Sequence, residues 1–161
     1  MSSVDVKNYI TPAGYQRLTE EFDFLHKKKR PEVCAALGAA AEEGDRSENA
    51  EYIYRKKQLR EIDSRLRFLS KRLDHIAVID PTEQKQTKKV YFGARVTVED
   101  EEGETTIYRI VGEDEVDGKA GDISWKSPIG KALLGKSVND TVVAQWHAGK
   151  RELTILKVRY R

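Results

Sequence analysis

Two long amphipathic stretches, separated by a short glycine-containing turn, constrain the fold of this chain more than any other feature of its sequence. In the second stretch, apolar residues recur at alternating spacings of three and four, and only Arg55 breaks the repeat. These residues are Tyr52, Leu59, Ile62, Leu66, Leu69, Leu73 and Ile76. The first stretch carries a similar stripe, which begins with Tyr15, Leu18, Phe22 and Leu25. Two such stripes joined at Glu43-Gly44 bury their apolar faces against each other, which predicts an antiparallel coiled-coil hairpin over residues 10–80.

The first predicted helix carries signals of its own at its start and in its interior. Thr11-Pro12 is typical of a helix start, because threonine caps the helix and proline at the first position loses no hydrogen bond. Pro31 lies inside the stretch, where a missing N–H and a clash with the preceding turn predict a kink. Beyond it, the smaller Val33 and Ala40 continue the apolar face. We therefore expect the two helices to approach closely near the turn.

From residue 90 onward, short β-like runs replace the helical periodicity. Runs bounded by turn signals predict strands at 90–98, 107–111, 141–146 and 152–160. In the last run, Thr154, Leu156, Val158 and Tyr160 alternate with Ile155, Lys157 and Arg159. Ser127-Pro128 begins a short helix that Gly135 is placed to end. The sequence thus predicts an α+β protein, with the hairpin, a polar linker at 81–89, and a small antiparallel sheet domain with one short helix at 90–161.

Composition excludes several classes of protein. The formal net charge is only +2 although 35% of the residues are charged, so the totals indicate no general attraction to nucleic acid. The single cysteine, Cys34, cannot form an internal disulfide, and the first ten residues lack the apolar core of a secretory signal. The longest apolar run, 33–41, is shorter than the roughly 20 residues that cross a bilayer. We therefore expect a cytoplasmic protein without a membrane partner.

The turn between the two predicted helices is unusually acidic. Five carboxylates lie within ten positions, and they are Glu42, Glu43, Asp45, Glu48 and Glu51. Asp45-Arg46-Ser47-Glu48 has the pattern of a capping box, which would give two of these acids a purely structural role. The alternative is that carboxylates this dense share a divalent cation, whose hard charge prefers oxygen ligands. Two carboxylates leave most of a magnesium octahedron to water, so no tight independent metal site is expected.

Basic residues follow directly behind the turn. Arg55, Lys56, Lys57 and Arg60 lie on the second predicted helix, and the run 27–30 lies near their level on the first. Two interpretations remain open, a solvated coiled-coil face or a phosphate-contacting patch behind a metal-holding tip. The second would steer a nucleic-acid strand toward the metal.

Several ordered motifs across both predicted domains resemble those of one known family. They are Arg30-Pro31-Glu32-Val33, Gly44-Asp45-Arg46-Ser47-Glu48-Asn49-Ala50-Glu51-Tyr52, Lys57-Gln58-Leu59-Arg60-Glu61-Ile62-Asp63, Val90-Tyr91-Phe92-Gly93-Ala94, Tyr108-Arg109-Ile110-Val111-Gly112 and Ser127-Pro128-Ile129-Gly130-Lys131-Ala132-Leu133-Leu134-Gly135. Together they resemble the bacterial Gre transcript-cleavage factors, with a match from about Ile10 to Tyr160. The chain is similar to the GreB branch in particular, because Arg46-Ser47 follows the Gly-Asp pair and basic residues are dense behind the tip.

The resemblance implies a mechanism and a set of site residues. The coiled coil would enter the secondary channel of RNA polymerase, while an FKBP-like domain docks on the rim of the channel. Asp45 and Glu48 would then be the catalytic acids, which hold a Mg²⁺ ion shared with the polymerase active centre. Arg55, Lys56, Lys57 and Arg60 would contact the nascent RNA 3′ end of a backtracked complex. The chain would act as a monomer that assists the polymerase's own cleavage activity, without being an enzyme itself or binding a cofactor tightly.

Two other functions remain as alternatives. The chain could be a channel-binding regulator that does not promote cleavage, although the intact Asp45 and Glu48 argue against this. It could also be a structural coiled-coil adaptor whose tip is only a capping box. The resemblance does not extend clearly to the loop at 119–126, so the docking residues stay unassigned. Ile53, an apolar residue beside the tip, has no role that the sequence predicts.

Overall fold

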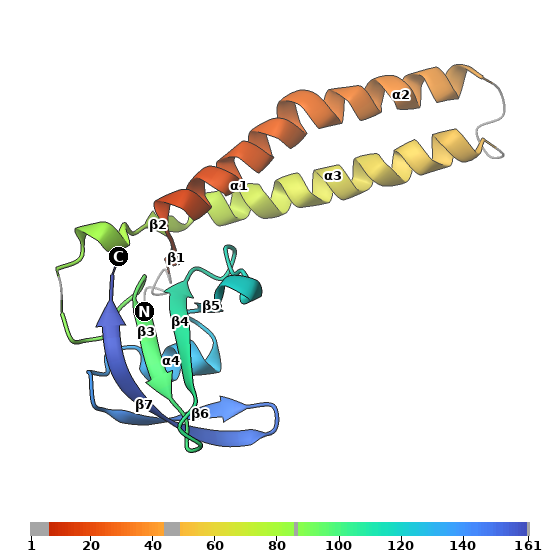
Figure 1. Ribbon diagram of the computed structural model, residues 1–161. Coiled ribbons are helices and arrows are strands. Elements are labelled where there is room, and N and C mark those ends of the chain that lie inside the picture. Colours follow the sequence, from red (N-terminus) through yellow and green to blue (C-terminus); the bar gives the residue numbers. More distant parts are fainter. Residues whose placement is uncertain (1–6, 44–48, 86, 161) are drawn as a thin grey trace, which may run out of the picture. The chain divides into compact units, whose positions relative to one another are not determined.

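The structure is a computed structural model that describes residues 7–43, 49–85 and 87–160 (Figure 1). The chain divides into two compact units, one formed by Gln16–His75 and the other by Met1–Tyr15 together with Ile76–Arg161. Among the described residues, no helix combines the length and the apolar character that crossing a membrane requires. The predicted α+β class is confirmed, because a helical hairpin is followed by a sheet unit.

The helical unit is built from two antiparallel arms that lie side by side (Figure 1). The first arm consists of α1 (Pro12–Phe24), a π-helical turn η1 (Leu25–Lys29) and α2 (Arg30–Glu42), and the second is α3 (Ala50–Asp74). The Thr11 hydroxyl accepts a hydrogen bond from the Gly14 N–H at 3.2 Å, which confirms the predicted cap. The distortion expected at Pro31 takes the form of the π-helical turn that precedes it, where a widened turn accommodates the proline.

The seam between the arms buries part of the apolar stripe that the sequence predicts, whereas Tyr15, at the start of that stripe, is 39% exposed. Val33 and Ala40 of α2 and Ile62 and Leu69 of α3 are all buried, and Leu69 has no exposed surface. The small Ala40 lies two residues before the end of α2, as expected for helices that approach closely near the turn. One assignment was wrong, because α3 ends at Asp74 and Ile76 belongs to a strand rather than to the helical seam.

A two-stranded parallel sheet, absent from the sequence prediction, lies in the unit that also holds the main sheet. Strand β1 (Asn8–Ile10) pairs in parallel with β2 (Ile76–Val78), and a 3₁₀ turn, η2 (Pro81–Glu83), follows. Ile76 uses its backbone groups for this pairing, which explains why α3 ends before it although the apolar repeat continues.

The main sheet has five strands in the order β5-β4-β3-β7-β6. Their bounds are β3 (Arg95–Glu99), β4 (Thr105–Val111), β5 (Asp122–Ser124), β6 (Thr141–Trp146) and β7 (Gly149–Arg159). The predicted all-antiparallel sheet is corrected to a mixed one, because β5 pairs in parallel with β4. The chain from 112 to 121, which includes the 3₁₀ turn η3 (Gly118–Ala120), supplies the crossover that parallel pairing requires. The predicted short helix is α4 (Pro128–Leu133), capped by Ser127.

Strand β7 departs from the strict alternation expected of it. The register against β3 shifts between Thr97 and Val98, which pair with Lys157 and Ile155 respectively. Leu156 is the extra residue of this β-bulge and is 40% exposed, whereas Ile155 is fully buried. Because a bulge moves the following residues to the other face, Leu156 does not share the buried side with Tyr160.

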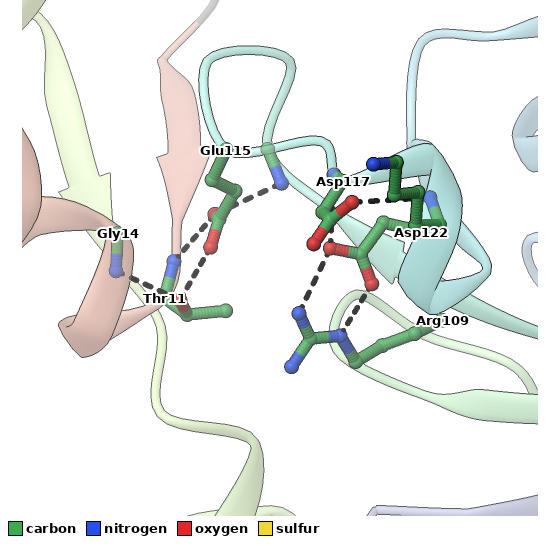
Figure 2. Close-up of polar contacts among 8 residues, drawn as sticks. Thr11, Gly14, Arg109, Glu115, Asp117 and Asp122 are labelled. Atoms are coloured by element: carbon green, nitrogen blue, oxygen red, sulfur yellow. Dashed lines mark hydrogen bonds and ion pairs between the residues drawn. The ribbon is translucent and has the colours of Figure 1, made fainter.

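Two buried carboxylates join segments of the sheet unit (Figure 2). Glu115 accepts hydrogen bonds from the Thr11 N–H at 2.8 Å, from the Gly112 N–H at 3.0 Å and from the Thr11 hydroxyl. A Cβ added at Gly14 would lie 2.7 Å from Glu115 Oε1, so a larger residue there would displace this carboxylate. Asp122 accepts two hydrogen bonds from Arg109, at 2.8 and 2.9 Å. These contacts fix the crossover segment against both β1 and β4.

Candidate functional site at the hairpin tip

Glu43 and Asn49 are the described residues on either side of the hairpin tip. Asp45 and Glu48, the predicted metal-holding acids, lie outside the described residues, which end at Glu43 and resume at Asn49. Glu43 and Asn49 both donate a hydrogen bond to the carbonyl oxygen of Ala40. This oxygen accepts hydrogen bonds from the Asn49 side-chain amide at 2.7 Å and from the Glu43 N–H at 3.3 Å. The described residues on either side of the tip, Glu43 and Asn49, are therefore tied to the same backbone oxygen.

Asn49 is the N-cap of α3. It has an extended backbone, and its side-chain oxygen accepts a hydrogen bond from the Tyr52 N–H at 3.1 Å. This corrects the capping-box interpretation, in which Asp45 was the cap of this helix. Asn49 is itself a preferred capping residue, so the signal was present in the sequence three positions before Tyr52. Asp45 and Glu48 are not needed to begin α3.

Replacing Asn49 by alanine is expected to destabilise the helical unit by about 2 kcal/mol. The loss combines a cap, typically ~1 kcal/mol, with one further hydrogen bond of similar size. Asn49→Asp is the matched control, because a carboxylate still accepts from Tyr52 but no longer donates to Ala40, and about half the loss is expected. Thermal unfolding followed by far-UV circular dichroism measures both. Equal destabilisation by the two variants would show that the cap contributes nothing.

The acidic residues that precede and follow the tip have different surroundings. Glu42 and Glu43, at the end of α2, are exposed. Glu51, in the first turn of α3, accepts a hydrogen bond from Arg55 Nε at 2.8 Å. Arg55 therefore offsets part of the negative charge that the sequence gathers here.

The four predicted RNA-contacting cations do not share one face of α3. Arg55 is half-buried and engaged, since it also donates to Gln58 Oε1 at 3.0 Å. Lys56, Lys57 and Arg60 are exposed, and their spacing of three and four residues places them on the outer side of the helix. Three of the four cations are therefore open to a ligand, while Arg55 is bound to Glu51 and Gln58.

The second basic group, at 27–30, is partly committed to the hairpin itself. Arg30 Nε donates to Asp63 Oδ1 at 2.7 Å across the seam, and this hydrogen bond holds the pKa of the Asp63 carboxyl below its ordinary value. Lys27 lies 3.8 Å from Asp23 in an exposed pair. These contacts favour the structural interpretation for Arg30 rather than a role in binding phosphate.

One further acidic cluster lies in the sheet unit. Asp100, Glu102 and Glu104 present carboxylate oxygens within 4.8 Å of one another. Asp100 Oδ1 accepts the N–H groups of Glu102 at 2.9 Å and Glu104 at 3.0 Å. The hairpin turn between β3 and β4 thus explains the arrangement without a metal ion.

Comparison with known families identifies the chain. A family model described as "Transcription elongation factor, N-terminal" matches residues 8–78, and one described as "Transcription elongation factor, GreA/GreB, C-term" matches residues 84–160. This chain belongs to the GreA/GreB family. The family membership spans both units of the structure, and Asp45 and Glu48 lie within the segment that the N-terminal model matches.

Individual relatives place the chain in the GreB branch of the GreA/GreB family. It is 51% identical to transcription elongation factor GreB of Yersinia pestis, over 96% of this chain and 90% of the relative. It is 53% identical to GreB of Xanthomonas axonopodis pv. citri, over 94% of this chain and 90% of the relative. A solved structure of GreA factor homolog 1 (Gfh1) from Thermus thermophilus aligns with a TM-score of 0.43 at 26% identity, covering 95% of this chain and 99% of Gfh1. The GreB-type resemblance of the sequence is thereby confirmed on the curated relatives.

Proposed function

We propose that this GreA/GreB-family elongation factor inserts its hairpin into the secondary channel of RNA polymerase and stimulates Mg²⁺-dependent cleavage of backtracked nascent RNA. The observation that carries the proposal is the cap of α3. Because Asn49 caps that helix, α3 does not rely on Asp45 or Glu48 for its start, and we assign these two acids to a metal ion. The rest of the hairpin then serves to carry these two acids into another protein's active centre.

The hairpin is suited to this task by its length and its packing. Helix α3 alone has 25 residues, which at about 1.5 Å per residue span about 38 Å. The seam of buried residues and the ion pairs between Arg30 and Asp63 and between Arg65 and Glu21, each at 2.7 Å, hold the arms together along this length. A rigid arm delivers its tip with little loss of conformational entropy on binding.

The donor set at the tip fits a shared Mg²⁺ ion. Mg²⁺ prefers oxygen ligands and keeps several waters, so two carboxylates from one protein suit a site that another protein completes. When bound, such an ion supplies an activated water or stabilises a leaving oxygen. Asp45 and Glu48 would hold the ion in place, and this chain by itself would neither bind it tightly nor cleave RNA.

The exposed cations behind the tip would guide the RNA 3′ segment. Lys56, Lys57 and Arg60 lie on the outer side of α3, where phosphates can reach them. Arg55 would act differently, by orienting its neighbours through Glu51 and Gln58. The sheet unit would dock on the rim of the channel, and we propose that the factor acts as a monomer in the cytoplasm.

The test is cleavage in a polymerase complex halted on RNA labelled at its 5′ end. One complex is backtracked by several nucleotides, and a control complex is halted without backtracking. The proposal predicts that the protein shortens the transcript only in the backtracked complex, and that extension resumes when nucleotides are added. Blocked extension without shortening would instead identify a regulator that does not promote cleavage.

A further inference from the structure

Two large residues beside the tip are exposed although the hairpin offers them a seam. Ile53 is 53% exposed and Tyr54 is 57% exposed, both within the first turn or so of α3. The buried residues of this helix, Ile62 and Leu69, lie about two and about four turns further along it. Packing within the hairpin therefore does not account for an aromatic ring at position 54.

The ring of Tyr54 is accompanied by a fixed cation. The Arg55 guanidinium carbon lies 5.4 Å from the Tyr54 ring centroid, within the range of a cation–π interaction. Two hydrogen bonds hold this guanidinium, from Nε to Glu51 at 2.8 Å and from Nη1 to Gln58 at 3.0 Å. A similar pair lies next to it, with Lys56 Nζ 5.8 Å from the Tyr52 ring centroid. Each of the two aromatic rings at the start of α3 is thus paired with a cation.

We propose that Tyr54 is a stacking residue for an unpaired base of the extruded RNA 3′ segment. The inference rests on the proposed function and adds a residue that reads a base rather than a phosphate. Proteins that bind single-stranded RNA combine cations that follow the backbone with aromatic rings on which bases stack. Here Tyr54 supplies the ring, and the cations are Lys57 and Arg60, about one and nearly two turns further along the same helix.

The charges around Tyr54 favour RNA over a protein surface as its partner. Docking the ring into an apolar protein pocket would remove water from Lys56 and Lys57 without offering them a partner, which is unfavourable. A nucleotide offers both a π face for the ring and a phosphate for the neighbouring ammonium groups.

The test compares Tyr54→Leu with Tyr54→Phe in the backtracked complex. The RNA carries either normal bases or abasic nucleotides in the extruded segment, and the readout is the rate of stimulated cleavage at saturating and at limiting factor. On normal RNA, Tyr54→Leu is expected to reduce stimulation about tenfold at limiting factor, while Tyr54→Phe, which keeps the π face, stays within about twofold. Melting temperatures of both variants should match the unmodified protein, because the residue is exposed.

The abasic RNA decides between a base contact and any other role. If Tyr54 stacks on a base, removing the base lowers the cleavage rate with the unmodified protein. The cleavage rate with Tyr54→Leu is then the same on abasic RNA as on normal RNA. An undiminished effect of Tyr54→Leu on abasic RNA would show that the ring contacts the polymerase, and would overturn the proposal. Normal cleavage by Tyr54→Leu would overturn it as well. Absence of cleavage by the unmodified protein would instead contradict the proposed function itself.

Discussion

Asp45→Asn combined with Glu48→Gln is expected to reduce stimulated cleavage at least about 100-fold. Both changes keep the size of the side chain and remove the negative charge that holds a divalent cation. A bound metal ion contributes several kcal/mol to the transition state, and about 2.7 kcal/mol already corresponds to 100-fold in rate. Cleavage of end-labelled RNA in a backtracked complex measures the effect.

The matched control for this pair is Glu42→Gln combined with Glu43→Gln. These acids are exposed at the end of α2, immediately before the tip, and their removal changes the local charge by the same amount. We expect the control to retain most of the stimulation. We also expect both double variants to melt like the unmodified protein, because Asn49 caps α3 in each. An equal loss in both double variants would indicate that only the local negative charge matters.

Asp122→Asn is expected to destabilise the sheet unit by about 3 kcal/mol. The Asp122 side chain is fully shielded from solvent and accepts two hydrogen bonds from Arg109, at 2.8 and 2.9 Å, and one from the Asp117 N–H at 3.2 Å (Figure 2). Breaking a buried pair typically costs 3–5 kcal/mol, and the lower end applies because the Arg109 side chain is 34% exposed. Asp23→Asn, in the exposed pair with Lys27, is the control and should change stability by less than ~1 kcal/mol.

The destabilisation by Asp122→Asn is also expected to depend on pH. Burial alone would raise the pKa of the Asp122 carboxyl, but the hydrogen bonds and charge of Arg109 outweigh it and hold the pKa below its ordinary value. A lowered pKa stabilises the folded state above the unfolded value of about 3.9, and this contribution disappears as the pH falls through the folded value. The free energies of unfolding of the unmodified protein and of Asp122→Asn are measured in urea at neutral pH and below pH 4. The difference between these two free energies should be smaller in acid. A difference that stays constant would contradict the role assigned to the ionised carboxylate.

The sequence was a good guide to the elements whose pattern repeats many times. Six apolar positions of α3 define one face, and burial of Ile62 and Leu69 follows from that repeat. The three-residue strands β1, β2 and β5 were missed because three residues are too few to display a period of two. Their parallel pairing joins segments far apart in the chain, such as Asn8 with Ile76, which no local pattern reveals.

Local detail at the candidate site was predicted less well than the hairpin that carries it. Both Asp45 and Asn49 are good capping residues, and only the backbone shows that α3 begins after Asn49. Arg55 looked like a member of the basic group, but its spacing of four residues from Glu51 and three from Gln58 engages it with both. Such choices depend on the helical phase and on the exact first residue of a helix, which sequence patterns define poorly.

The most direct test of the central claim is the Mg²⁺ dependence of cleavage in one backtracked complex. The concentration that gives half-maximal cleavage is measured with the unmodified protein, with the Asp45→Asn/Glu48→Gln variant and without added protein. If the tip acids hold a shared ion, the unmodified protein lowers that concentration and raises the rate, while the variant behaves like the complex alone. The same Mg²⁺ dependence and rate with the unmodified protein and with the variant would contradict the assignment of Asp45 and Glu48 as metal-holding residues.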